Sequence, residues 1–167
     1  FENGWRDWYV EGSTWQIGRP TSGPGLAHSG TNCAGTILNG NYPSSVNAWL
    51  ISPQFVVPAA NQQPRLRFWS WHTMAGSDYG QVQIRTNGGA WVSLTEALWD
   101  STAGSAWMQR IVDLTAYGGQ TVQLGFHFVA DQYCCKTAGW YVDDLSVETS
   151  PLVFCNPEGF ENGWGDW

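Results

Sequence analysis

The sequence predicts an all-β protein, folded as a sandwich or barrel of antiparallel strands. Several stretches alternate apolar and polar residues with the two-residue period of a half-buried strand. Gly, Pro, Asn and Ser separate these stretches, and Gly alone accounts for 20 of the 167 residues. An amphipathic helix of useful length is missing from the pattern, since residues 94–98 would give at most one or two turns.

Five stretches carry the strand pattern. In residues 64–71, Leu66 and Phe68 alternate with polar residues and tryptophans, so the two apolar side chains are expected to face the core. The same alternation places Val82 and Ile84 inward. The remaining predicted strands are 91–94, 122–128 and 139–147, with turns expected at Asn87-Gly88-Gly89 and Tyr117-Gly118-Gly119.

The length and the charge limit the class of protein. A chain of 167 residues is expected to form one domain. The net charge of −7 and the pI of about 4.6 count against nucleic acid as a partner, because phosphate contacts require Lys and Arg. Lys136 is the only lysine. No segment is apolar and long enough to span a membrane, so we expect any export signal or anchor to lie outside this segment.

The four cysteines predict two disulfides in an oxidising compartment. Cys33, Cys134, Cys135 and Cys155 do not have the spacing of a zinc ribbon or a redox motif. Buried free thiols in a cytosolic protein are the alternative. A bond between adjacent cysteines would strain the backbone, so Cys33 and Cys155 are each expected to pair with one of Cys134 and Cys135.

The two ends of the chain carry nearly the same octamer. Residues 1–8 read FENGWRDW and residues 160–167 read FENGWGDW, and they differ only in Arg6 and Gly165. This repetition predicts a module over residues 1–149, a linker over 150–159, and the first strand of a next tandem repeat over 160–167. The last segment could instead add a strand to a neighbouring module.

Motifs in a fixed order connect the chain to a known group. They are FENGWRDW, AHSGTNCAGT at 27–36, LRFWSW at 66–71, DYGQVQI at 78–84, and GWYVDDLSV at 139–147. Together they resemble the bacterial cleaved-adhesin and choice-of-anchor J modules, which are similar to MAM domains. The resemblance implies a galactose-binding-like jelly-roll β-sandwich of two antiparallel sheets in a secreted or cell-surface protein.

The resemblance also implies a structural calcium site. In such jelly rolls an acidic residue of the first strand and one of the last strand often share a cation. The matching residues are Glu2, Asp143 and Asp144. Calcium prefers six to eight oxygen ligands, which carboxylates and backbone carbonyls supply. The alternative is that these acids are solvated or cap a turn.

Aromatic and amide side chains on the predicted strands suggest a glycan-binding face. Flat aromatic rings stack on sugars, while amide and guanidinium groups bond their hydroxyls. Contact with a neighbouring module or packing within the fold are the alternatives, since Trp is buried on average. The candidates for ligand binding are Arg67, Trp71, Gln83, Arg85 and His127.

Catalysis has little support in the sequence. The three histidines are too scattered for a metal triad, and a Gly-x-Ser-x-Gly motif is absent. We therefore predict a non-catalytic extracellular tandem-repeat module of a fibre, sheath or adhesin stalk, with neighbouring copies of itself as partners and glycans as further candidate partners. The alternative is a carbohydrate-binding module of a secreted hydrolase or peptidase.

Overall fold

The computed structural model describes residues 1–99, 106–133 and 136–149. These residues form two antiparallel sheets packed face to face, so the predicted jelly-roll β-sandwich is confirmed. The predicted linker 150–159 and the second octamer 160–167 lie outside the described residues. Two short 3-10 helices, η1 (Ala60–Gln62) and η2 (Thr115–Tyr117), are the helices of the described parts, and neither is long and apolar enough to cross a membrane.

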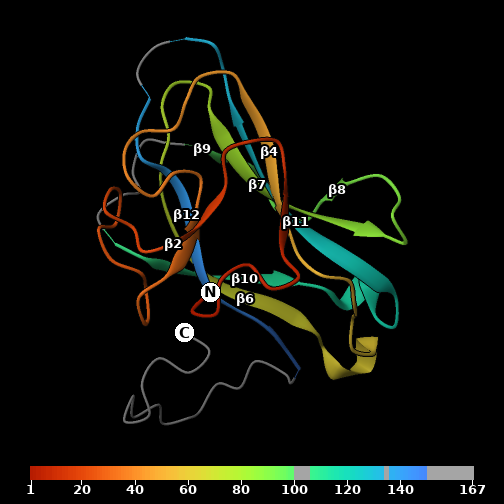
Figure 1. The fold of residues 1–167 in the computed structure, drawn as a ribbon. Coiled ribbons are helices and arrows are strands. Elements are labelled where there is room, and N and C mark those ends of the chain that lie inside the picture. The colour runs from red at the N-terminus through yellow and green to blue at the C-terminus, as the bar shows by residue number, and fades with distance from the viewer. Residues whose placement is uncertain (100–105, 134–135, 150–167) are drawn as a thin grey trace, which may run out of the picture.

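Sheet A is built around β11, the long strand that lies between β4 and β7 (Figure 1). Its strand order is β1-β4-β11-β7-β8, with β5 paired to β11 and β9 paired to β7. All of these pairs are antiparallel. The bounds are β1 Tyr9–Glu11, β4 Val46–Ile51, β5 Phe55–Val56, β7 Tyr79–Thr86, β8 Val92–Ser93, β9 Leu98–Trp99 and β11 Thr121–Ala130.

Sheet B is built around β6 and β12 and forms the other layer (Figure 1). Its strand order is β10-β6-β12-β3-β2, again antiparallel throughout. The bounds are β2 Gln16–Gly18, β3 Cys33–Gly35, β6 Arg65–Thr73, β10 Met108–Asp113 and β12 Gly139–Glu148. The consecutive strands β6 and β7 therefore belong to different sheets.

The core lies between the inner faces of the two sheets. Leu66 and Phe68 on β6 point inward, as do Val82 and Ile84 on β7, so the predicted alternation of these strands is confirmed. Phe68 meets Phe126 of the opposite sheet edge-on, with 5.2 Å between ring centroids. Burying each large apolar side chain contributes about 1.5–3 kcal/mol.

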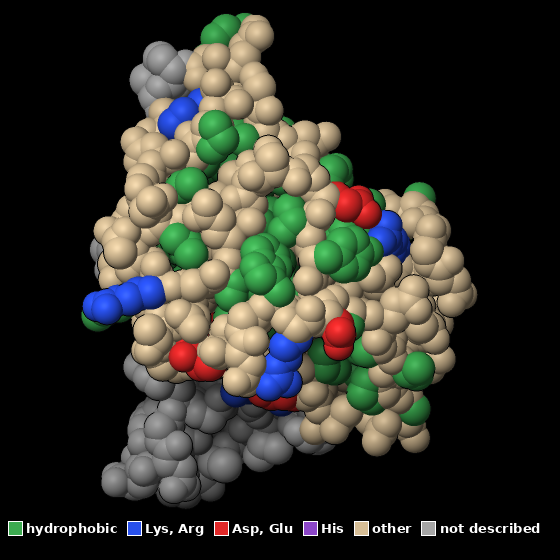
Figure 2. Space-filling model, viewed as in Figure 1, with side chains coloured by type: hydrophobic (Ala, Val, Ile, Leu, Met, Phe, Trp, Pro, Cys, Tyr) green, Lys and Arg blue, Asp and Glu red, His purple; other side chains and the backbone are tan. Residues whose placement is uncertain are grey.

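Hydrophobic side chains that reach the surface do so in separate groups. On the side of the molecule shown in Figure 2, these groups alternate with polar side chains and backbone, and charged side chains are sparse. That view agrees with the charged fraction of only 13%. A broad, continuous apolar patch of the kind that marks an obligate interface does not appear on this side.

Candidate functional site

The outer face of sheet A, meaning the face turned away from sheet B, carries polar and aromatic side chains. Alternate residues of β4, β11 and β7 face outward, because their neighbours fill the core. Strand pairing places Trp49 beside His127 and His127 beside Gln81 in one row across the sheet. The side chains of this face include Tyr9, Glu11, Asn47, Trp49, Gln81, Gln83, Arg85, Trp91, Gln123 and His127.

His127 and Trp49 form the centre of a hydrogen-bonded network. Their rings stack in parallel, with 3.9 Å between centroids and 3° between planes. The Trp49 Nε1–H donates to Gln83 Oε1 over 2.9 Å, and Gln83 Nε2 lies 3.3 Å from His127 Nδ1. On the other side of the ring, His127 Nε2 lies 2.7 Å from Asn47 Oδ1. The network fixes the orientation of the indole on the sheet.

Burial lowers the pKa of His127 to about 4. The imidazole is therefore neutral at pH 7, with one nitrogen that donates and one that accepts. The partners fit a tautomer with the proton on Nε2, which donates to Asn47 while Nδ1 accepts from the Gln83 amide. This part of the face presents no positive charge at neutral pH.

Gly125 leaves room for two indole rings at the middle of the face. A Cβ atom at residue 125 would lie 2.8 Å from Cη2 of Trp91 and 3.2 Å from Cδ1 of Trp49. Both tryptophans are partly exposed. Trp91 also lies against the Arg85 guanidinium, whose carbon is 4.5 Å from the ring centroid, in a cation–π contact. The glycine thus allows two flat aromatic side chains to approach each other over β11.

Arg85 is held by several partners on the same face. Its Nε donates to Gln123 Oε1 over 3.1 Å and its Nη2 donates to the Tyr9 hydroxyl over 2.6 Å. Glu11 Oε1 lies 3.9 Å from Nη1. The positive charge is balanced by one carboxylate, and the rest of the face is made of amides, hydroxyls and aromatic rings.

The structure divides the predicted ligand residues between two faces. Gln83, Arg85 and His127 lie together on the outer face of sheet A. Arg67 and Trp71 lie on β6 in sheet B, where Trp71 is buried and Arg67 forms an ion pair of 3.3 Å with Glu148. The prediction of a single face was wrong on this point, because alternation shows which side of a strand faces outward but not which sheet the strand joins.

Trp49, Trp91 and Asn47 belong to the face and were missed in the sequence. Trp49 and Asn47 alternate with the buried Val46, Ala48 and Leu50. That alternation marks a half-buried strand and would have identified both residues. Trp91 precedes the short strand β8, so its position over Gly125 depends on tertiary packing and has no local signal.

The outer face of sheet B is covered by the loop of residues 19–32. His28 stacks on Trp69 with 3.8 Å between centroids, and the Ser22 hydroxyl lies 3.0 Å from the hydroxyl of Tyr141. Beneath the loop, Trp71 and Tyr141 pack edge-on with Cys33 and Leu38 in a second apolar cluster. Under the loop, the outer face of sheet B is therefore a small apolar core, and Trp71 and Tyr141 do not form an exposed aromatic surface.

The three predicted calcium ligands hold this covering loop. Asp143 Oδ2 accepts the backbone N–H groups of His28 and Ser29 over 3.0 and 3.2 Å. Asp144 contacts the side chains of the same two residues, both at 2.6 Å. Asp144 lies in a β-bulge of β12 and has a φ of 48°. Burial and the neighbouring Asp144 raise the pKa of Asp143 above its ordinary value.

Glu2 holds the end of the same loop. Its Oε1 accepts the N–H groups of Thr31 and Asn32 over 3.0 and 2.7 Å, and these bonds lower the pKa of Glu2. No three His, Cys, Asp or Glu side chains of the described residues group closely enough to hold a metal ion. In this arrangement the carboxylates accept N–H and O–H bonds from the loop. The calcium site stays a prediction.

Cys33 does not match the predicted disulfide. It is a free thiol that is fully buried in the second apolar cluster, and burial raises its pKa to about 12. A thiol in such surroundings is unreactive at neutral pH. Its predicted partners Cys134 and Cys135 lie outside the described residues, as does Cys155.

Comparison with known proteins gives two large relatives. The chain is 34% identical over 153 residues to Bacillopeptidase F of Bacillus subtilis, a match that covers 87% of the chain and 10% of that protein. It is 29% identical over 121 residues to the pre-pro-metalloprotease PrtV of Vibrio cholerae, covering 65% of the chain and 13% of that protein. The chain therefore spans about a tenth of the length of these relatives. No protein-family model matches it.

Two solved structures share the architecture over nearly the whole chain. The K3 cleaved adhesin domain of Lys-gingipain from Porphyromonas gingivalis has a TM-score of 0.58 and 22% identity, covering 89% of this chain and 95% of that one. The chain has the fold of a cleaved adhesin domain. The carbohydrate-binding module TmCBM61, solved in complex with β-1,4-galactotriose, has a TM-score of 0.58 and 15% identity, covering 89% and 92%. The cleaved-adhesin fold thus extends to carbohydrate-binding modules.

Proposed function

We propose that this chain is a non-catalytic, extracellular glycan-binding module, and that it holds the glycan on the outer face of sheet A. The observation that carries the proposal is the approach of Trp49 and Trp91 over Gly125, in the middle of a face rich in amide side chains. Flat rings with a few oriented polar groups are typical of sites that bind small polar ligands.

The network around the tryptophans favours recognition over mere packing. Trp49 is oriented by Gln83 and His127, and Trp91 is backed by Arg85. Side chains that are already fixed lose less conformational entropy when a ligand binds. The carbohydrate-binding modules among the structural neighbours support glycans as the class of ligand.

The same face gives no support for glycoside hydrolysis. That reaction normally uses two carboxylic acids on either side of the scissile bond. Among the residues described for this face, Glu11 is an acid, and it lies beside Arg85. The neighbouring adhesin and carbohydrate-binding domains support a binding role as well.

A second candidate function is that of one module in a tandem array. The repeated octamer at residues 1–8 and 160–167 favours it, and so does the small share of each large relative that the chain spans. An array of sugar-binding modules would gain affinity from multivalency. Binding and repetition are compatible, and both suit a cell-surface or secreted protein.

The test is a binding experiment with matched tryptophan variants. We expect the protein to bind a neutral oligosaccharide such as β-1,4-galactotriose or another member of a glycan array, and Trp91→Ala to weaken that binding about tenfold or more. Trp107→Ala is the control, because Trp107 is also partly exposed but lies with His28 on the side of sheet B. Equal affinity in all three proteins, or no binding to any glycan, would refute the proposal.

A further inference from the structure

A hollow of about 260 Å³ lies where residues 1–8 pass over Leu145 of β12. Two aromatic residues form its apolar walls. Trp8 is anchored in the core by Phe126, with 6.3 Å between ring centroids, and Phe1 packs edge-on against Trp8 at 5.5 Å. Asn3 supplies an amide at the rim. The walls of the hollow are therefore fixed by the fold.

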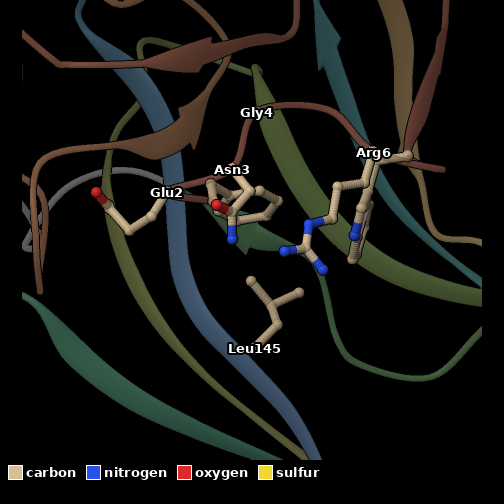
Figure 3. A pocket seen from close by; sticks show the side chains of 7 residues that line it. Glu2, Asn3, Gly4, Arg6 and Leu145 are labelled. Carbon is tan, nitrogen blue, oxygen red and sulfur yellow. The ribbon is translucent and has the colours of Figure 1, made fainter.

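Arg6 extends over this hollow and is not neutralised. In Figure 3 its side chain points toward Leu145, whereas the Glu2 carboxylate points away from both. Glu2 Oε1 is engaged by the backbone of residues 31 and 32. The ion pairs of arginine and lysine among the described residues involve Arg65, Arg67, Arg85 and Lys136, and none of them includes Arg6.

The backbone of Arg6 is in a conformation that suits glycine. The Trp8 N–H donates to the Trp5 carbonyl over 2.8 Å, which closes a turn with Arg6 as its first central residue. The φ of Arg6 is 45°, in the left-handed region, where a side chain costs free energy. The second octamer carries Gly165 at the equivalent position. In the first octamer an arginine thus occupies a strained position that glycine would fill without strain.

We propose that this hollow binds a uronic acid residue of a glycan, with Arg6 holding its carboxylate. A guanidinium group pairs with a carboxylate through two parallel hydrogen bonds, which makes arginine the side chain best suited to this anion. Trp8 and Phe1 supply apolar surface for a sugar ring, and Asn3 supplies hydrogen bonds for its hydroxyls. Backbone strain that persists at a ligand site is a recurring feature of binding proteins.

This site is separate from the face of sheet A. Its walls are Trp8, which packs toward the core, and Leu145, which belongs to sheet B. The two sites also differ in ligand class, because the sheet A face pairs its arginine with Glu11, whereas Arg6 is unpaired among the described residues. The proposal for Arg6 therefore stands or falls independently of the proposed function.

The experiment titrates the 167-residue chain with galacturonic acid, with galactose and with free glutamate, and follows the Trp8 indole resonance. We expect galacturonic acid to bind, and galactose and glutamate to bind at least about tenfold more weakly. Arg6→Gly should remove the difference between galacturonic acid and galactose and should raise the melting temperature. Arg6→Lys should retain part of the difference, because it keeps the charge but not the paired donors.

Arg19→Gly is the control, because it removes an exposed arginine elsewhere in the chain. It should leave galacturonic acid binding unchanged. The proposal is overturned if Arg6→Gly binds galacturonic acid like the wild type, or if galactose or glutamate binds as tightly as galacturonic acid. A fall in melting temperature of Arg6→Gly would refute the claim that the backbone at residue 6 is strained by its side chain. Absence of galacturonic acid binding by the wild type would refute the proposed binding site.

Discussion

The strands of both sheets alternate core residues with outward-facing aromatic residues, but on the outer face of sheet B a loop covers these aromatic residues. On sheet A, Trp49 and Trp91 remain partly exposed beside amide side chains. On sheet B, Trp71 and Tyr141 are buried beneath the loop of residues 19–32. The covering loop, and not the strand pattern, decides whether an outward-facing tryptophan becomes core or remains available to a ligand.

The largest expected effect comes from exchanging one tryptophan on each face for alanine. Trp71→Ala should lower the free energy of unfolding by about 3–5 kcal/mol, because it empties a buried cluster beneath the loop. Trp49→Ala should cost about 1–2 kcal/mol, because the indole is only partly buried. Urea denaturation of both variants measures the difference. Equal losses would contradict the assignment of the two faces.

A smaller effect is expected from a pair of glycines that sit under aromatic rings. A Cβ at Gly35 would lie 2.7 Å from the fully buried Tyr141, and a Cβ at Gly125 would lie 2.8 Å from the partly exposed Trp91. Gly35→Ala should cost about 2–3 kcal/mol, because the covered ring cannot yield. Gly125→Ala should cost about 1 kcal/mol or less but should weaken glycan binding, because Trp91 can swing outward.

Thermal unfolding and a glycan titration of the two glycine variants separate stability from binding. The comparison of faces fails if Gly125→Ala destabilises the protein more than Gly35→Ala does. It also fails if Gly125→Ala retains full glycan affinity, since the two indoles would then not need to meet over residue 125.

The next prediction concerns Asp143, whose carboxylate holds the covering loop of residues 19–32. Asp143→Ala removes the acceptor for the N–H groups of His28 and Ser29 and should cost about 2 kcal/mol. Asp113→Ala is the control, because this exposed acid accepts its hydrogen bonds from Thr115, two residues away, and does not hold the covering loop. The predicted calcium site at Glu2, Asp143 and Asp144 would make the loss in Asp143→Ala larger with excess calcium than with a chelator. An equal loss in both would contradict that site and leave the hydrogen bonds to the loop as the cause.

The smallest effect is a pH dependence that arises on the face of sheet A. The pKa of His127 is about 4 in the folded protein and near 6.5 in an unfolded chain. Between these values the unfolded state binds more protons, so stability is full above pH 6.5 and falls as the pH drops toward 4. His127→Gln should lessen this loss by on the order of 1–2 kcal/mol in denaturation curves at pH 7 and pH 4.5. An unchanged pH slope would contradict a neutral, buried imidazole.

The sequence supported correct predictions of the fold class and of the direction of many side chains. Leu66, Phe68, Val82 and Ile84 point inward, as their alternation predicted. The pairing of strands could not be predicted in the same way. Residues 65–73 and 79–86 follow each other in the chain but join opposite sheets, and strand alternation contains no information about that crossover.

Because strand pairing could not be predicted, only some of the predicted site residues lie together. Gln83, Arg85 and His127 lie on adjacent strands of one sheet, so they meet as expected, while Trp71 lies in the other sheet. The three acids do converge on one region, as the resemblance implied. Their oxygens accept backbone N–H groups of a loop whose path the sequence pattern does not reveal.

Sheet A, and not sheet B, presents the tryptophans proposed to bind the glycan. The most direct measurement is a titration of the isotopically labelled protein with an oligosaccharide that it binds, observed through the indole N–H resonances. We expect the resonances of Trp49 and Trp91 to shift with ligand while those of Trp69 and Trp107 stay in place. Shifts confined to Trp69 and Trp107, with Trp49 and Trp91 unchanged, would contradict the account.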